Sequence, residues 1–279
     1  MLKDITLGQY FPGDSIIHRL DPRTKILFTL IYIVALFMAK SYVSYAVMAA
    51  FLITCIKVSK VNPKNLFRGL KPLIIIIIFT GLLNMFYTSG TVLVKFWIFQ
   101  ITKEGIRNAA FMILRIIMLV SGTFLLTFTT APIALTDGLE SLLNPLKKIK
   151  LPVHELAMMM SIALRFIPTL IEETDKIMSA QKSRGASFDQ GNLMKRAKAL
   201  IPLFIPLLFN SIRRAYELAN AMTCRCYNGG KGKTTMNALK FSLRDYMSIL
   251  VMAFLIGGII VLNIFCGEYN AEFTFNLAV

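Results

Sequence analysis

Two arginines with small neighbours are the side chains in this sequence best suited to a specific contact. The two runs around them consist of Ser183, Arg184, Gly185 and Ala186, and of Cys224, Arg225 and Cys226. A guanidinium presents a planar fork of donors that fits a carboxylate, and small neighbours would let such a tip enter a narrow groove. Alternatively, each arginine ends a helix, where its charge interacts favourably with the dipole and a glycine supplies the left-handed cap. The residue types leave both readings open.

A glycine- and lysine-rich run, residues 229–235, invites comparison with a phosphate-binding loop. Such a loop needs a glycine five residues before its Gly-Lys-Thr sequence, so that the backbone wraps the phosphates, and that position here is Tyr227. A flexible basic linker that faces anionic lipid explains the composition better. The chain is therefore not expected to hydrolyse ATP.

The cysteine and histidine residues do not predict a metal site. Two of the four cysteines lie inside apolar runs, and Cys224 and Cys226, with only two histidines in the chain, lack the spacing of a tetrahedral ligand set. Neither a Ser-His-Asp set nor a pair of carboxylates within an apolar run is present. We expect no catalytic residue, no bound cofactor and no metal. A membrane-bound enzyme that uses Arg115 or His154 is retained only as an alternative.

The composition indicates that the elements positioning these residues are membrane helices. Hydrophobic residues make up 56% of the 279 positions and charged residues only 16%, and the mean hydropathy is +0.62. Several apolar runs approach the roughly 20 residues that a helix needs to cross the hydrocarbon layer. The formal charge of +16 resides mostly between those runs, as expected of cytoplasmic loops. We therefore predict an all-α polytopic membrane protein that does not bind nucleic acid.

Residues 1–131 are predicted to form a membrane domain with a cytoplasmic leader and four spans. The leader ends in a basic stretch in which Asp21 suits a helix N-cap and Pro22 the first helical position. The first two apolar runs are short and separated only by Lys40 and Ser41, which favours a tight helical hairpin over the alternative of one long helix. The four predicted spans are residues 26–39, 42–56, 72–87 and 105–131.

Three further segments complete the predicted topology. Residues 88–104 predict a small hairpin or interfacial loop on the outside, with Trp97 at headgroup depth. No apolar run in residues 132–245 is expected to cross, and 17 of the 31 Lys and Arg residues lie there, which predicts a large cytoplasmic insert. Residues 246–279 are predicted to hold a fifth span, Tyr246–Cys266, and a tail on the outside.

A single arginine, Arg115, lies near the middle of the fourth predicted span. A charge at that depth is costly, so its side chain should face the protein interior, a water-filled groove or a partner. The alternative is a tilted helix from which the side chain reaches the outer headgroups. The sequence supports both readings equally.

Two long amphipathic helices are predicted within the insert, and they resemble weak copies of each other. The run Phe166–Leu170 is similar to Phe204–Leu208, and the arginine follows the start of each run by 18 and 21 residues respectively, a difference of about one turn. Three internal prolines would bend these helices along a curved surface. Methionines 158–160 add a soft apolar surface that can repack against more than one partner. An ordinary helical hairpin explains the apolar stripes but not two similar arginine-ended tips.

Together these stretches resemble the transmembrane T component, the EcfT family, of energy-coupling factor (ECF) vitamin transporters, a class of ABC-type importers. The resemblance covers nearly the whole chain. It rests on Phe11–Ser15, His18–Lys25, Gln181–Phe188 and Cys224–Tyr227. The family carries two short Ala-Arg-Gly-like motifs at the ends of its coupling helices, and the two arginine runs are similar to them. The cysteines on both sides of Arg225 depart from the pattern and put a glycine-dependent turn there in doubt.

The resemblance implies a scaffold in the bacterial cell membrane. Its partners would be two ABC-type ATPases, on which ATP and Mg²⁺ act, a vitamin-binding S component, and the lipid bilayer. Arg184 and Arg225, with their small neighbours, would each dock into a groove on one ATPase. The apolar faces of the two helices would grip the S component and change its orientation in the membrane. The contact residues so implied are Met158, Met159, Met160, Ile167, Phe204 and Leu207.

Two alternatives to this shared scaffold remain. The same scaffold could be dedicated to one substrate, such as cobalt or biotin, instead of serving several S components. A passive membrane anchor with a helical hairpin would instead tolerate the loss of both tip arginines.

Overall fold

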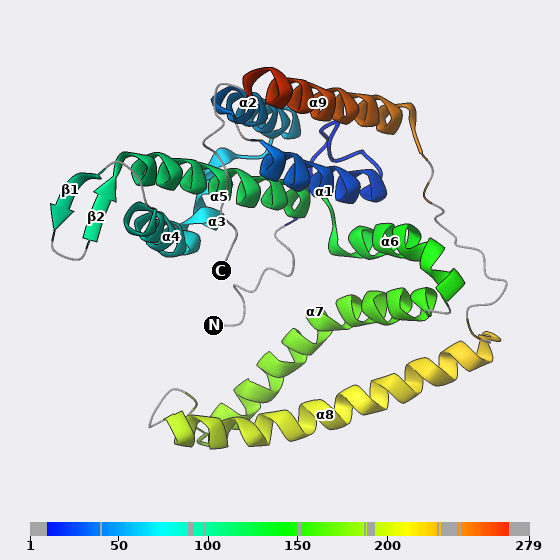
Figure 1. Cartoon of the computed structure of the whole chain (residues 1–279). Coiled ribbons are helices and arrows are strands. Elements are labelled where there is room, and N and C mark those ends of the chain that lie inside the picture. The colour runs from blue at the N-terminus through cyan, green and yellow to red at the C-terminus, as the bar shows by residue number, and fades with distance from the viewer. Residues whose placement is uncertain are drawn as a thin grey trace. The chain divides into compact units, whose positions relative to one another are not determined.

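The computed structural model describes residues 10–39, 41–88, 92–96, 99–149, 152–186, 188, 193–227, 229, 239 and 241–267. Most of these residues are helical (Figure 1). The chain divides into two compact units. We call the described part of residues 8–138 and 239–279 the span unit, and the described part of residues 139–238 the arm unit.

The span unit consists of helices joined by short connections. Its helices are α1 (Pro22–Met38), α2 (Tyr42–Ser59), α3 (Pro63–Leu70), the 3-10 helix η1 (Lys71–Leu73), α4 (Ile74–Tyr87), α5 (Lys103–Thr129) and α9 (Leu243–Gly267). The helix α6 (Pro132–Leu143) begins in this unit and ends in the arm unit, where the 3-10 helix η2 (Asn144–Ile149) follows. The predicted helical hairpin is confirmed, because α1 and α2 are separate helices and the Tyr32 and Phe51 rings stack with centroids 6.3 Å apart. One long helix is thereby excluded.

A short antiparallel hairpin connects α4 and α5. Its strands are β1 (Val92–Phe96) and β2 (Phe99–Thr102), and the register places Phe96 opposite Phe99. The predicted small hairpin in this segment is confirmed. Trp97, expected at headgroup depth, lies outside the described residues.

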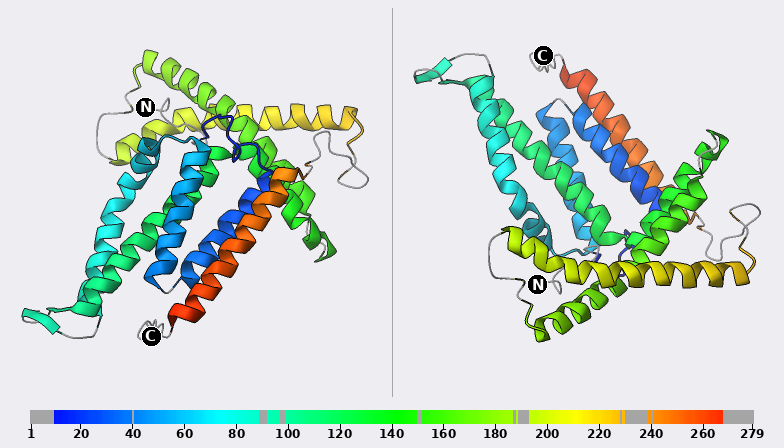
Figure 2. Two further views of the ribbon diagram at one scale, coloured as in Figure 1. Left: turned by 90° about the horizontal axis from the view of Figure 1, so that it is seen from above. Right: turned by 90° about the horizontal axis from the view of Figure 1, so that it is seen from below.

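A hydrophobic core joins α1, α2, α5 and α9, and Figure 2 shows these helices running alongside one another. Leu36, Tyr45, Met48 and Ile259 are among its fully buried side chains. Lipid tails are as apolar as these side chains, so close packing, more than exclusion of water, holds such helices together. Gly122 illustrates how close the packing is, since a Cβ atom at this position would lie only 2.6 Å from the Tyr32 ring.

Five segments among the described residues are long and apolar enough to cross a membrane. They are α2, Pro63–Phe86, α5, Val153–Ser183 and Leu243–Ile264. The predicted all-α polytopic class is confirmed, but the set of candidate spans differs from the predicted one. The helix α1, with 17 residues, is not among the five. The expectation that nothing in residues 132–245 is long and apolar enough to cross is wrong, because Val153–Ser183 combines 31 residues with an apolar first half.

Arg115 of α5 is held inside the span unit by aromatic side chains of α1 and α2. Its Nε donates a hydrogen bond to the Tyr45 hydroxyl at 2.7 Å. Its guanidinium carbon lies 5.7 Å from the ring centroids of both Phe37 and Tyr45. Such cation–π contacts gain strength where water is excluded. The structure therefore favours a helix-packing role for Arg115 over a side chain that reaches toward the headgroups.

The leader is tied to α1 and α9 through the carboxylate of Asp245, which is only 1% exposed. Asp245 Oδ1 accepts hydrogen bonds from the Asp21 N–H (2.9 Å) and the Thr24 hydroxyl (3.2 Å). Its Oδ2 accepts from the N–H and the hydroxyl of Ser242, both at 2.8 Å. A buried carboxylate is tolerated when its lone pairs are filled in this way. Asp21 itself caps α1, as predicted, by accepting from the Arg23 N–H at 2.9 Å.

Lys25 is a second buried charge at the same end of the span unit, and it is 6% exposed. Its Nζ donates to the backbone carbonyls of His18 and Thr129, both at 3.0 Å. The His18 ring lies 2.6 Å from the Ser15 hydroxyl through Nδ1 and 3.1 Å from the Phe11 carbonyl through Nε2. A carbonyl only accepts, so Nε2 carries the proton and Nδ1 accepts from Ser15. Burial lowers the pKa of His18, which further favours this neutral form.

Replacing Asp245 with asparagine should destabilise the span unit. Each carboxylate oxygen faces a backbone N–H, so either orientation of the amide turns its NH₂ group toward a donor that cannot rotate away. We expect a loss of about 2–3 kcal/mol, seen as a lower thermal unfolding midpoint of the detergent-solubilised chain. Asp14→Asn is the matched control, because Asp14 is 94% exposed and pairs with Arg19 at the surface. Equal midpoints for Asp245→Asn and wild type would contradict the assigned role.

Candidate functional site

The arm unit is dominated by two long helices, α7 (Val153–Ser183) and α8 (Leu193–Cys224), which confirms the predicted amphipathic pair. Pro168 lies inside α7, and Pro202 and Pro206 lie inside α8. An internal proline removes a backbone hydrogen bond and crowds the preceding turn, so it bends a helix. Figure 1 shows such a bend in α7.

A polar cluster marks the place where α7 and α8 cross, and Figure 2 shows the crossing. Asn210 Nδ2 of α8 donates to Glu173 Oε1 of α7 at 2.7 Å. Arg214 Nη2 of α8 lies 3.0 Å from Glu173 Oε2. The Glu173 side chain is 16% exposed and that of Arg214 is 32% exposed, so water screens this ion pair less than an ordinary surface pair. We call Glu173, Asn210 and Arg214 the crossing clamp.

The C-terminus of α7 ends in a complete Schellman cap. The Gly185 N–H donates to the Lys182 carbonyl and the Ala186 N–H donates to the Gln181 carbonyl, both at 3.0 Å. Gly185 has a φ of +89°, the left-handed conformation that this motif requires. Arg184 therefore occupies the cap position, directly before the chain turns away from the helix.

The C-terminus of α8 repeats this cap without a glycine. The Cys226 N–H donates to the Thr223 carbonyl and the Tyr227 N–H donates to the Met222 carbonyl, both at 2.9 Å. Cys226 takes the left-handed conformation, with a φ of +57°. The doubt that the sequence raised about this turn is removed, because cysteine adopts the conformation for which glycine was expected. Arg225 occupies the same cap position as the first arginine.

The two arginine tips therefore share one backbone geometry, and both are exposed. Arg184 and Arg225 are exposed, and neither guanidinium has a hydrogen-bond or ion-pair partner within the part of the chain that the structure describes. Ser183 and Cys224, which precede them, are also exposed and add little bulk. Each arginine ends its helix and also presents an unpaired fork of donors, so the two readings of the sequence are compatible.

The crossing clamp is the part of the site that sequence reasoning missed. Arg184 follows Glu173 by 11 residues, and Arg225 follows Arg214 by 11 residues. Eleven residues make about three helical turns and about 16 Å. Each tip thus lies at the same distance from the crossing, on nearly the same helix face as its clamp residue. The repeated offset was visible in the sequence, but the pairing of Glu173 with Arg214 was not.

Apolar side chains cover much of the exposed surface of α7 and α8. The predicted partner-contact residues are either exposed (Met159, Met160 and Phe204) or half-buried (Met158, Ile167 and Leu207). Further exposed apolar side chains on α8 are Ile201, Ile205, Leu208, Phe209 and Ile212. An apolar surface of this extent is typical of contact with a membrane or a protein partner.

The remaining candidate residues contribute little chemistry. Residues 229–235, apart from the first glycine, lie outside the described residues. Cys224 and Cys226 are free thiols, and the described residues contain no cluster of three or more His, Cys, Asp and Glu that could hold a metal. His154 Nδ1 lies 2.8 Å from Glu140 Oε1 and so joins the start of α7 to the end of α6.

Comparison with known proteins identifies relatives along most of the chain. A family described as cobalt transport protein (CbiQ) matches residues 13–236, which include the leader and both tips. A protein of Clostridium kluyveri is 52% identical over 270 residues, covering 96% of this chain and all of that protein. A protein of Heliobacterium modesticaldum is 55% identical over 246 residues, covering 88% of this chain and 92% of that protein. A protein of Bacillus subtilis is 45% identical over 260 residues, covering 92% of this chain and 98% of that protein. All three are named energy-coupling factor transporter transmembrane protein EcfT.

The helical fold, its candidate spans and these relatives define a multi-pass membrane component of a transporter. Within that class, the chain belongs to the EcfT family of energy-coupling factor transporter transmembrane proteins. The resemblance inferred from the leader and the arginine tips is thereby confirmed.

Removing the Glu173 side chain should loosen the crossing of α7 and α8. In Glu173→Ala the partly buried Asn210 amide loses its hydrogen-bond acceptor, and the Arg214 guanidinium loses its ion-pair partner. We expect a clearly broader distance distribution between spin labels at positions 182 and 223, measured by pulsed electron paramagnetic resonance. The native cysteines would be replaced by serine for this measurement.

The neighbouring ion pair offers a matched control for this experiment. Arg213 and Glu217 also pair on α8, but their side chains are 80% and 66% exposed, and such surface pairs contribute about 0–1 kcal/mol. Glu217→Ala should therefore leave the distribution unchanged. A distribution for Glu173→Ala that matches wild type would show that the crossing does not depend on the clamp.

The left-handed residue at each tip should set the local stability of that tip. Cys226→Gly relieves a conformation that costs an L-residue roughly 1 kcal/mol, so amide exchange in the last turn of α8 should slow about fivefold. Gly185→Ala should accelerate exchange at the end of α7 by a similar factor; a Cβ there meets no neighbour, so only backbone strain changes. Cys226→Ser removes the thiol but keeps the strain, and should match wild type. Faster amide exchange in Cys226→Gly than in wild type would show that the left-handed conformation of Cys226 does not destabilise the tip.

Proposed function

We propose that this chain is the coupling scaffold of an ECF importer, which transmits ATP-driven movement of two ATPase subunits to a substrate-binding S component. One observation carries the proposal: two exposed arginine tips with the same capped backbone lie 11 residues from one shared clamp. Two equivalent tips suit two similar docking grooves, as a pair of related ATPases would offer. Family membership supports the proposal, since the relatives are named as transmembrane proteins of ECF transporters.

In this proposal each guanidinium enters a groove on one ATPase and pairs there with a carboxylate. A bidentate fork of this kind is both strong and geometrically selective. The small side chains beside Arg184 and Arg225 allow the close approach. They are Ser183, Gly185, Ala186, Cys224 and Cys226. ATP and Mg²⁺ act on the ATPases, and this chain supplies docking residues rather than catalytic ones.

The crossing clamp couples the movements of the two helices. Glu173 of α7 contacts Asn210 and Arg214 of α8. Glu173 precedes Arg184 by 11 residues, and Arg214 precedes Arg225 by 11 residues. When ATPase closure moves the tips, the helices turn about the clamp instead of separating. One hydrogen bond and one ion pair between flexible side chains can follow a change in crossing angle that tightly interlocked apolar side chains would resist.

The exposed apolar surface of α7 and α8 is the proposed contact for the S component. Turning these helices changes the orientation of the S component in the membrane, so that bound substrate is released inside the cell. Methionines 159 and 160 are exposed within this surface. Their flexible, polarisable side chains repack easily, which suits exchangeable S components.

We place the N-terminus and residues 132–245 in the cytoplasm and the C-terminus outside. The excess of Lys and Arg in the insert supports this orientation. The helix α7 then lies along the membrane surface, although it is long enough to cross. Its apolar half contains Glu155 and Arg165, and its second half contains the clamp residue Glu173 and Lys176; each is costly in hydrocarbon, whereas an amphipathic helix keeps such groups at the interface.

A scaffold dedicated to one substrate is the second candidate. The description of the matching family as cobalt transport protein favours it. The soft methionine surface favours a shared scaffold instead. Co-expression with several different S components distinguishes the two, because only a shared scaffold would form a complex with more than one of them.

Reversing the charge at both tips should abolish ATPase binding. The tagged chain would be co-expressed with two ECF ATPases and purified as wild type, Arg184→Glu, Arg225→Glu and the double variant. A hot-spot arginine contributes about 2 kcal/mol or more, or about thirtyfold in affinity. We therefore expect each single variant to lose most of one ATPase and the double variant to lose both.

Two charge reversals away from the tips provide the controls. Lys176→Glu and Arg213→Glu alter exposed side chains of the same two helices, and both variants should bind the ATPases normally. Substrate uptake should follow ATPase binding across the set. If the double variant still bound both ATPases, the arginines would act only as helix caps. That result would favour the alternative of a passive membrane anchor. Activity of the purified chain without ATPases would favour an enzyme.

A further inference from the structure

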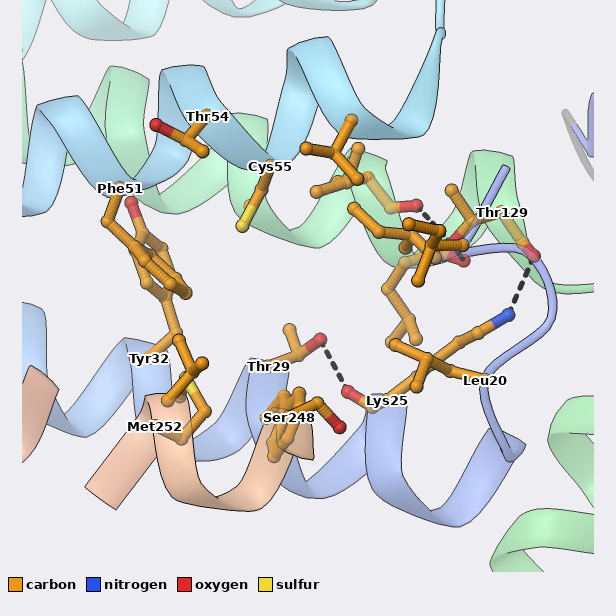
Figure 3. Close-up of a pocket in the computed structure, with 18 of the residues that line it drawn as sticks. Leu20, Lys25, Thr29, Tyr32, Phe51, Thr54, Cys55, Thr129, Ser248 and Met252 are labelled. Carbon is orange, nitrogen blue, oxygen red and sulfur yellow. Dashed lines mark hydrogen bonds between the residues drawn. The ribbon is translucent and has the colours of Figure 1, made fainter. Parts of the chain in front are cut away.

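A cavity of about 600 Å³ lies within the span unit between α1, α2, α5, α9 and the leader (Figure 3). Its walls are almost entirely apolar and include Phe28, Leu52, Val58, Leu125, Leu126 and Val251. The volume is in the range of sites that hold small molecules. The proposed coupling function makes no use of this cavity.

The cavity is a slot that runs along the helices. Its lining extends from Lys25 to Tyr32 on α1 and from Arg244 to Met252 on α9, which corresponds to about 10–12 Å at 1.5 Å per residue. Figure 3 shows Tyr32, Phe51 and Met252 together at one end and Lys25 at the other. The stacked Tyr32 and Phe51 rings line the end opposite Lys25. The slot is therefore somewhat shallower than one leaflet of a hydrocarbon layer about 30 Å thick.

The rim of the slot is apolar and exposed. Val58 of α2 is 39% exposed, and Met247 and Val251 of α9 are 71% and 50% exposed. All three also line the cavity. Exposed apolar side chains on membrane helices face lipid tails, so a hydrocarbon chain can enter the slot sideways from the bilayer without passing polar groups.

Two cations line the end of the slot opposite the aromatic pair. Lys25 and Arg244 are the only charged residues among those that line the cavity. Lys25 uses two of its three ammonium donors on backbone carbonyls. Arg244 is exposed and has no polar partner elsewhere in the described part of the chain. An anion at this end would complete the hydrogen bonding of both groups.

We propose that the cavity binds an anionic phospholipid, with an acyl chain in the slot and the phosphate at Arg244 and Lys25. The apolar walls select a hydrocarbon chain, and the two cations select a headgroup that carries net negative charge. A zwitterionic headgroup would bring a cation of its own beside Arg244 and gain less. Basic pockets between membrane helices bind anionic headgroups in this way. The bound lipid would contact all four core helices and the leader.

Native mass spectrometry of the full chain in mild detergent tests this proposal. The chain would be incubated with phosphatidylglycerol or with phosphatidylcholine of the same acyl composition. We expect one phosphatidylglycerol per chain, retained at least tenfold better than phosphatidylcholine. Arg244→Gln should lower its retention to the phosphatidylcholine level. Arg68→Gln removes an exposed cation of α3 that does not line the cavity, and should behave as wild type.

Reactivity of Cys55 provides a second readout that does not depend on the headgroup variant. Cys55 lines the cavity, and a chain with the other three cysteines replaced by serine would be treated with an alkyl methanethiosulfonate. Phosphatidylglycerol should slow this reaction at least fivefold, and phosphatidylcholine should not. Three results would overturn the proposal. They are equal retention of the two lipids, unchanged retention of phosphatidylglycerol by Arg244→Gln, and a Cys55 reaction rate that does not change with phosphatidylglycerol. So would a lipid-free dimer in which Cys55 is protected from the reagent, which would identify a second copy as the occupant.

Discussion

Satisfying charge inside an apolar layer of helices is the constraint on which the span unit depends. Asp245 meets it with N–H and hydroxyl donors, and Lys25 meets it with backbone carbonyls. Arg115 meets it with the side chains of Tyr45 and Phe37. Close apolar packing holds these helices together, and the buried charges add specific pairings to it. An unpaired buried charge costs several kcal/mol, so each of these groups fixes the alignment of the elements that meet at it. The result is one arrangement of α1, α2, α5, α9 and the leader.

The arm unit applies the same principle at a single point. Much of the apolar surface of α7 and α8 is exposed, so apolar burial alone does not determine where the two helices cross. The Glu173 carboxylate, which lies beside Asn210 and Arg214, gives the crossing a specific polar contact. A pair of helices fixed at one polar contact keeps its position while its angle remains adjustable. That combination is what the proposed coupling role requires.

Local features of the fold were predictable from the sequence, and distant pairings were not. The N-cap at Asp21 and the hairpin between α4 and α5 follow from nearest-neighbour rules, and both are confirmed. The bond between Asp21 and Asp245 joins residues 224 apart, and no single-sequence pattern indicates it. The helix α7 shows a different limit: its apolar first half is compatible both with crossing a membrane and with lying on it. The arginine tips were identified by residue type, but the clamp that relates them required the structure.

The cap at Cys226 shows that backbone geometry, more than residue identity, defines a tip. A left-handed cysteine is strained, and strain of this kind persists where the surroundings over-determine the conformation. Here two backbone hydrogen bonds impose the turn at the end of α8, and the same two bonds form around Gly185 at the end of α7. What the two tips share is therefore the direction in which the cap residue projects as the chain leaves the helix. Cys226 completes on α8 the cap that Gly185 completes on α7, so a motif search that required glycine would miss the second tip.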